Sequence, residues 1–148
     1  MTLEMRDYVL DKEQIKQIIP HREPFLFLDK VIEVGEDFII AQKTITKEDC
    51  EGHFPGSPIF PGHLSLEALA QSATCLVLFN HPELKSERIV VMVESEGKFS
   101  QPILPENIIV LSVWLKKSKL GMYFFEGNIV LNHNGQMVVK WKGIGSIL

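Results

Sequence analysis

The sequence predicts an α+β domain in which antiparallel strands pack on one long helix, and three observations support this class. Good helix formers run through residues 64–79. Segments rich in β-forming residues precede and follow this run, as expected when one sheet covers one helix. The 148 residues are 45% hydrophobic and 23% charged, values typical of folded proteins. We therefore expect a single domain over residues 1–148.

The N-terminal part predicts a short helix followed by a β-hairpin. Asp11 and Gln14 have the spacing of a capping box, and Pro20 ends the helical stretch that follows. Extended-type residues then run from 25 to 46 and are divided by Gly35-Glu36-Asp37, which predicts the turn of a hairpin. The second arm alternates through four side chains: Phe38, Ile40, Lys43 and Ile45.

The long helix follows a loop. Proline and glycine are too frequent in residues 52–62 for a helix or a central strand. The next residues repeat with helical spacing and form one apolar face: Leu66, Leu69, Ala70, Ala73 and Val77. Polar side chains form a second stripe on the same helix: His63, Glu67, Gln71 and Thr74. A polar stripe on an apolar helix predicts a cleft beside it.

The C-terminal part predicts strands over five segments: 88–94, 98–103, 107–116, 122–131 and 136–148. Residues 132–135, Asn-His-Asn-Gly, have the composition of a turn.

Charge and composition exclude several classes of protein. The net charge of −4 argues against a nucleic-acid-binding protein, and the longest apolar runs, 108–111 and 129–131, are far shorter than the roughly 20 residues of a bilayer span. Residues 1–7 do not resemble a secretory signal. Cys50 and Cys75 have no CxxC spacing and are expected to be reduced thiols. We expect a cytoplasmic protein without membrane or nucleic-acid partners.

His53 and Glu67 are the main candidates for acid–base chemistry. His53 opens the rigid loop that leads directly into the helix carrying Glu67, and a positioned acid–base group needs such rigidity. Glu67 is alternatively a solvated helical residue, and His81 and His133 are expected to be ordinary surface histidines. Gly62 lies just before the helix, where free N–H groups and the helix dipole stabilise negative charge; equally, it simply permits the turn.

A specific family signature spans residues 53–71, which read HFPGSPIFPGHLSLEALAQ. This segment closely resembles the signature of the FabZ-type (3R)-hydroxyacyl-[acyl-carrier-protein] dehydratases. Residues 19–26 and the later Lys98-Phe99, Pro102 and Pro105 also resemble that family, so the similarity covers nearly the whole chain. The resemblance implies a hot-dog fold, an antiparallel sheet wrapped around one long central helix. It also implies a homodimer with tunnels between protomers, and a trimer of dimers is usual in the family.

The resemblance further implies a reaction and roles for individual residues. His53 corresponds to the acid–base histidine, Glu67 of the partner protomer to the carboxylate, and the Gly62 N–H to the group that polarises the thioester carbonyl. Together they would dehydrate a 3-hydroxyacyl thioester on acyl carrier protein to the trans-2-enoyl thioester, in fatty-acid or related biosynthesis. No cofactor or metal ion is implied. Three neighbouring residues are expected to contact the substrate: Phe54, Pro61 and His63.

Two positions depart from the family pattern, and other functions stay open. His63 and Ser65 stand where the family usually has aliphatic side chains, which leaves a specialised polyene or polyketide dehydratase as an alternative. A hot-dog thioesterase would not require His53. A metal hydrolase would use His53, His63 and Glu67 as ligands, although the HExxH spacing is absent. A non-catalytic acyl-binding module is a further alternative.

Three lysines would attract an acidic carrier or form a solvated face: Lys116, Lys117 and Lys119.

Overall fold

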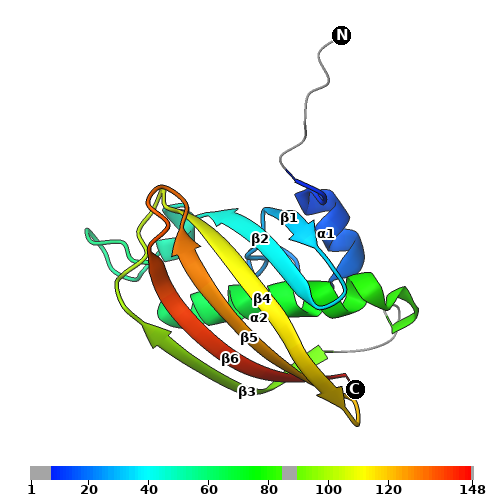
Figure 1. Cartoon of the computed structure of the whole chain (residues 1–148). Helices are drawn as coiled ribbons and strands as arrows, with labels where there is room; N and C mark the ends of the chain where they lie inside the picture. Colours follow the sequence, from blue (N-terminus) through cyan, green and yellow to red (C-terminus); the bar gives the residue numbers. More distant parts are fainter. Residues whose placement is uncertain (1–7, 85–89, 148) are drawn as a thin grey trace.

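The computed structural model describes residues 8–84 and 90–147. Within these ranges, a six-stranded antiparallel sheet curls around one long helix, α2 (Gly62–Asn80), as Figure 1 shows. The strands are β1 (Lys30–Val34), β2 (Phe38–Thr44), β3 (Val90–Phe99), β4 (Ile108–Lys119), β5 (Met122–Leu131) and β6 (Met137–Ile147). Their order across the sheet is β1-β2-β4-β5-β6-β3. This arrangement confirms the predicted α+β class and the hot-dog fold. No helix among the described residues is both long and apolar enough to span a bilayer.

The N-terminal elements agree with the sequence prediction. Helix α1 (Lys12–Ile18) begins with a complete capping box, because Asp11 Oδ1 accepts from the Gln14 N–H at 2.8 Å and Gln14 Oε1 accepts from the Asp11 N–H at 2.9 Å. Ile15 buries the inner face of this helix. Strands β1 and β2 then form the predicted antiparallel hairpin.

The alternation predicted for β2 is wrong in phase for two residues. Ile39 and Ala41 are fully buried, whereas Phe38 and Ile40 lie half-buried on the opposite face. Residues 38–40 are all apolar, so they fit either phase of a two-residue repeat. Lys43 and Ile45 are buried on the same side as Ile39 and Ala41, although Ile45 lies just beyond the strand.

Strand β3 corrects another prediction, because residues 88–94 and 98–103 do not form two strands. Their described part contains one strand, Val90–Phe99, and residues 88 and 89 lie outside the described ranges. Gly97 does not interrupt this strand: a Cβ at Gly97 would lie 2.6 Å from Leu66 Cδ2 on α2. The glycine therefore marks the close approach of sheet and helix. The other three predicted strands correspond to β4, β5 and β6, and the predicted turn joins β5 to β6.

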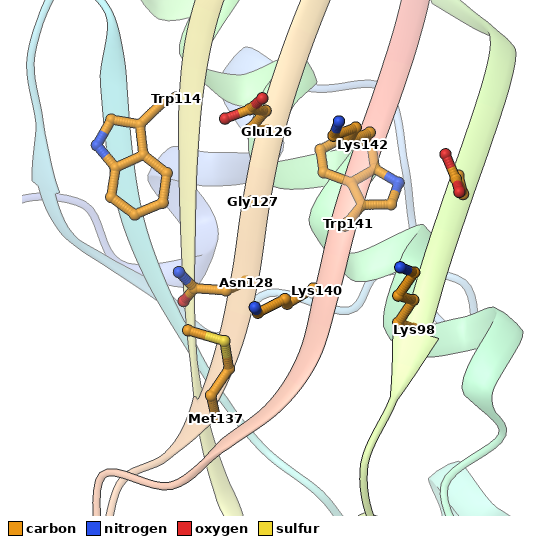
Figure 2. Close-up of a pocket in the computed structure, with 10 residues that line it drawn as sticks. Lys98, Trp114, Glu126, Gly127, Asn128, Met137, Lys140, Trp141 and Lys142 are labelled. Atoms are coloured by element: carbon orange, nitrogen blue, oxygen red, sulfur yellow. The ribbon is translucent and has the colours of Figure 1, made fainter.

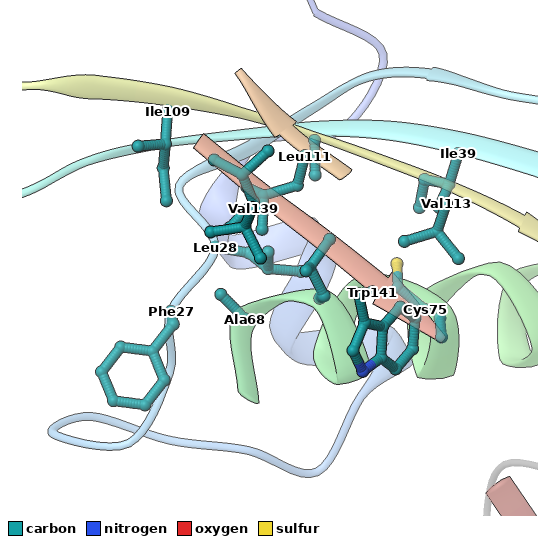
Figure 3. Close-up of a cluster of buried hydrophobic side chains, with 14 of the residues drawn as sticks. Phe27, Leu28, Ile39, Ala68, Cys75, Ile109, Leu111, Val113, Val139 and Trp141 are labelled. Atoms are coloured by element: carbon teal, nitrogen blue, oxygen red, sulfur yellow. The ribbon is translucent and has the colours of Figure 1, made fainter. Parts of the chain in front are cut away.

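The core lies between α2 and the concave face of the sheet, and Figure 3 shows part of it. Trp141 on β6 occupies the middle of this face, where its ring stacks on Phe125 at 6.3 Å between centroids. Gly127 and Gly143 make room for the indole, because a Cβ at Gly127 would lie 3.0 Å from it and one at Gly143 would overlap it. Ser95 Oγ accepts the indole N–H at 2.9 Å. Each large apolar side chain buried here contributes about 1.5–3 kcal/mol.

Candidate active site

His53 lies in the predicted loop, between a short 3₁₀ turn, η1 (Glu48–Cys50), and the start of α2. Its backbone N–H donates to Cys50 O at 2.9 Å, and its carbonyl accepts from the Ile59 N–H at 2.7 Å. The ring Nδ1 lies 3.0 Å from Ile59 O. Because a carbonyl oxygen only accepts, Nδ1 carries a proton, and the neutral ring therefore presents Nε2 as its basic nitrogen. Phe54 stacks on the imidazole at 4.2 Å between centroids.

Gly62 is the first residue of α2 rather than the residue before it, and Pro61 is the N-cap. The Gly62 N–H consequently has no partner inside the helix and lies at the positive end of the helix dipole. Ser65 is buried and donates its hydroxyl to Gly62 O at 2.6 Å. Phe99 covers Gly62 so closely that a Cβ there would lie 3.1 Å from Phe99 Cε1. A side chain at this position would therefore press on the Phe99 ring, which would have to shift slightly.

A hollow of about 360 Å³ adjoins the beginning of α2. Its lining is mainly apolar and includes Ile59, Phe60, Gly62, Ser65, Phe99 and Ile103. An apolar hollow beside free helical N–H groups suits an acyl thioester, whose carbonyl is polar and whose chain is apolar.

Glu67 is held by an unexpected partner, Gln71. Gln71 Nε2 donates both to Glu67 Oε1 at 3.0 Å and to Phe25 O at 2.8 Å, while Gln71 Oε1 accepts the Phe27 N–H at 2.8 Å. Gln71 is fully buried and Thr74 is buried, so the predicted cleft along the polar stripe is wrong for both residues. The segment around Phe25 and Phe27 covers the Gln71 end of the stripe. Only Glu67, half-buried, and the exposed His63 remain accessible.

His21, which the sequence argument did not select, lies beside Glu67. Its Nε2 is 3.6 Å from Glu67 Oε1, and its Nδ1 is buried and has no hydrogen-bond partner among residues 8–84 and 90–147. Burial lowers the pKa of His21; the Glu67 carboxylate opposes this and Arg22 adds to it. The neutral form is favoured, so we interpret the contact with Glu67 as a weak polar contact and not as an ion pair. The motif Pro20-His21-Arg22 was the signal that could have found this residue.

The structure gathers the candidate residues into two groups. Gly62, Ser65 and Phe99 meet at the hollow, whereas Glu67 meets Gln71 and His21. Neither a hydrogen bond nor an ion pair connects His53 to Glu67 within the described chain. Phe54 and His63 are exposed, Pro61 is half-buried, and their predicted contact with substrate stays a prediction.

Two other sites suggested by the sequence have different surroundings in the structure. The lysines at 116, 117 and 119 belong to the end of β4 and not to a turn; Lys117 Nζ lies 4.5 Å from the Phe124 ring centroid. In the described ranges, no three His, Cys, Asp or Glu side chains are grouped to hold a metal ion, so the metal-hydrolase alternative has no ligand set there. Cys50 and Cys75 are free and buried, and burial raises the pKa of Cys75 to about 12.

A second hollow, of about 330 Å³, lies on the outer face of the sheet and is drawn in Figure 2. Its lining includes charged side chains from neighbouring strands: Glu96, Lys98, Glu126, Lys140 and Lys142. Trp114 lies at its edge, and α2 is on the other side of the sheet (Figure 2). None of His53, Gly62 and Glu67 lines this hollow, so we assign the candidate active site to the region around the beginning of α2.

Comparison with known proteins gives three findings. The family model of the FabA-like domain matches residues 19–142. The 3-hydroxyacyl-[acyl-carrier-protein] dehydratase FabZ of Haemophilus influenzae is 37% identical over 143 residues, which cover 94% of this chain and 95% of that protein. The bifunctional enzyme LpxC/FabZ of Porphyromonas gingivalis is 36% identical over 110 residues, which are 73% of this chain but only 24% of that longer protein.

One solved structure supports the fold independently. The dehydratase heterocomplex ApeI:P from Xenorhabdus doucetiae contains a chain that superposes with a TM-score of 0.77. The match covers 94% of this chain and 91% of that chain at 16% sequence identity. At this identity the likeness supports the hot-dog fold and nothing finer.

Proposed function

Because the chain belongs to the FabZ-type dehydratases of the FabA-like domain family, we propose that it removes water from (3R)-3-hydroxyacyl thioesters carried on acyl carrier protein. The product is the trans-2-enoyl thioester of fatty-acid or related biosynthesis in the cytoplasm. One observation carries the proposal most directly: the Nδ1 of His53 lies 3.0 Å from Ile59 O, which leaves Nε2 as the basic nitrogen on the loop that leads to the Gly62 N–H. A base and an oxyanion donor are thus supplied by one rigid segment.

The proposed chemistry assigns one task to each group. His53 Nε2 accepts the proton from C2 of the substrate, and the negative charge that develops on the thioester oxygen is stabilised by the Gly62 N–H at the positive end of α2. Glu67 orients or protonates the hydroxyl that leaves C3. If Glu67 only orients the hydroxyl, His53 passes the proton taken from C2 to that hydroxyl, and water leaves. If Glu67 donates the proton, it regains one through solvent from the protonated His53 after water has left. Both side chains return to their starting states in either case, and the C2–C3 bond becomes double. Neither a cofactor nor a metal ion is needed for this balance.

We further infer that the active unit is a homodimer in which His53 of one protomer works with Glu67 of the other. The absence of a bond between these two residues within the described chain supports this arrangement. Strand β3 supports it too, because it lies at the end of the sheet order, and Val93 and Phe99 on it are 54% and 51% exposed. A long, exposed, partly apolar edge strand is usually paired or covered. A trimer of dimers would be built from the same unit.

A single assay tests the proposed reaction and separates it from its nearest rival. The purified protein is incubated with 3-hydroxyacyl thioesters of several chain lengths on acyl carrier protein, and both conjugated enoyl product and free carrier thiol are measured. Dehydration predicts enoyl product without thiol release, and loss of that product in His53→Ala. A thioesterase would release the thiol without forming an enoyl product, and an acyl-binding module would form neither.

A further inference from the structure

A lysine is buried on the inner face of β2. Lys43 is only 5% exposed and follows the buried Ile39 and Ala41 on the same face of the strand. Lysine is almost never buried unless its charge is paired. The partner is Asp49, whose Oδ2 lies 3.1 Å from Lys43 Nζ. An ion pair stands here where a core usually has an apolar contact. Buried ion pairs often add little to the free energy of unfolding, so we look for a role of this pair other than stability.

Asp49 connects this pair to the loop of His53. Asp49 Oδ2 also accepts the Thr46 N–H at 2.8 Å and the Thr46 hydroxyl at 2.9 Å, which closes the turn η1. The last residue of η1, Cys50, accepts the His53 N–H at 2.9 Å. Burial acts to raise the pKa of Asp49, but the Thr46 N–H and Lys43 outweigh it and hold the pKa below its ordinary value. Asp49 is therefore charged at neutral pH and anchors the turn that precedes His53.

Lys43 also reaches the group that holds Glu67. Its Nζ lies 6.0 Å from the centroid of the Phe27 ring, within the range of a cation–π contact. The N–H of the same Phe27 donates to Gln71 Oε1 at 2.8 Å, and Gln71 Nε2 donates to Glu67 Oε1 at 3.0 Å. One buried ammonium group thus contacts both the support of His53 and the support of Glu67.

We propose that Lys43 and Asp49 are positioning residues for the dehydration: within one protomer they hold the His53 loop, which serves one composite site of the dimer, and the Phe27–Gln71–Glu67 chain of contacts, which serves the other. Neither residue touches the substrate. A charged hydrogen bond suits this task because it is short and directional, whereas hydrophobic attraction has no preferred direction. Displacement of a catalytic group by about 1 Å costs up to roughly a hundredfold in rate, so the pair acts on turnover. This inference rests on the proposed function.

Kinetics of matched lysine variants test the proposal. Lys43→Met keeps the aliphatic stem and removes the charge, and should lower kcat by roughly tenfold to a hundredfold with little change in KM. Lys43→Arg should recover part of the loss. Asp49→Asn keeps an acceptor for Thr46 and should lower kcat less than Lys43→Met. The control is Lys12→Met, which breaks a lysine–aspartate pair of 3.3 Å at the surface and should leave both constants unchanged.

A second measurement separates failure of this inference from failure of the proposed function. Nitrogen-detected NMR of the histidine side chains in the free protein should show the His53 resonances shifted in Lys43→Met and those of the exposed His133 unchanged. All variants are measured below their unfolding transition. If the wild type forms no enoyl product, the proposed function fails and the NMR result alone decides whether Lys43 positions His53.

Specific outcomes would overturn the proposal. They are a kcat for Lys43→Met within about twofold of the wild-type value together with unchanged His53 resonances, or a Lys43→Arg variant no better than Lys43→Met. If Lys43→Met does not fold, Asp49→Asn and Lys43→Arg carry the test. Wild-type kcat, KM and His53 resonances in both of these would then refute the positioning role.

Discussion

Gln71 Nε2 donates to Glu67 Oε1 at 3.0 Å, one turn away on α2. Through Gln71, the proposed catalytic carboxylate is connected to a segment far away in the sequence. The same amide group binds Phe25 O and the Phe27 N–H, so the whole end of the Gln71 side chain is used. The orientation of Glu67 on α2 is therefore set from outside the helix.

Replacing Gln71 should be costly for this reason. Gln71→Met leaves the buried Phe27 N–H and the partly buried Phe25 O without their Gln71 partner, and should lower the free energy of unfolding by about 2–4 kcal/mol. Thr74→Val is the matched control, because the Thr74 hydroxyl donates to Ala70 O of its own helix at 2.9 Å and not to a distant segment of the described chain. Urea unfolding at one protein concentration measures both. Equal losses in the two variants would contradict the structural role given to Gln71.

Stability should depend on pH through His21. Burial lowers the pKa of His21 in the folded protein, against the opposing effect of Glu67, whereas the unfolded chain binds a proton near pH 6.5. The unfolded state therefore holds more protons between these two pKa values, and stability falls as the pH falls from about 6.5 through the folded pKa. His21→Gln should flatten this slope and His133→Gln should not. Unfolding free energies from pH 5 to about 7.5 decide; an unchanged slope in His21→Gln would refute the account.

Gly127 should tolerate no side chain, in contrast to a second glycine on the same face. A Cβ at Gly127 would lie 2.9 Å from the backbone oxygen of Ser112 and 3.0 Å from Trp141, so Gly127→Ala should cost about 1–3 kcal/mol of unfolding free energy. A Cβ at Gly145 would meet nothing closer than 3.7 Å. Gly145→Ala should therefore be nearly neutral. Thermal or urea unfolding of the two variants measures this difference. Similar losses of unfolding free energy in Gly127→Ala and Gly145→Ala would contradict the prediction.

Ser65 should influence the choice of acyl chain. Ser65→Val adds apolar volume to the hollow beside Gly62 and removes the hydroxyl bound to Gly62 O. We expect kcat/KM for the longest accepted chains to fall by roughly tenfold relative to the shortest, the scale of one or two misfitted methyl groups. His63→Val alters the other departure from the family pattern, at an exposed position, and is the comparison variant. If both variants keep the wild-type ranking of substrates, neither residue sets the selectivity.

Much of the fold could be predicted because its signals are local. The capping box of Asp11 and Gln14 and the helical spacing of α2 need only neighbouring residues. Failures occurred where the local signal was ambiguous or misleading. Residues 38–40 fit both faces of a strand, and Gly97, which resembles a break in a strand, instead marks contact with Leu66.

The candidate site was only partly predictable for a related reason. His53, Gly62 and Glu67 belong to one continuous segment, and its resemblance to a family made them visible. The surroundings of Glu67 depend on contacts between residues distant in sequence. Gln71 contacts Phe27 and Glu67 contacts His21, and the helical or strand periodicity of the sequence predicts neither contact.

Mixing of two inactive variants tests the central claim, that His53 of one protomer and Glu67 of the other form each catalytic pair. His53→Ala and Glu67→Gln chains are refolded together at equal amounts and assayed for enoyl product. In a mixed dimer, one composite site carries both lesions and the other carries neither. Random pairing makes about half of the dimers mixed, so activity should return to roughly a quarter of the native value. If both residues came from the same chain, every site would hold one lesion, and no activity would return at any mixing ratio.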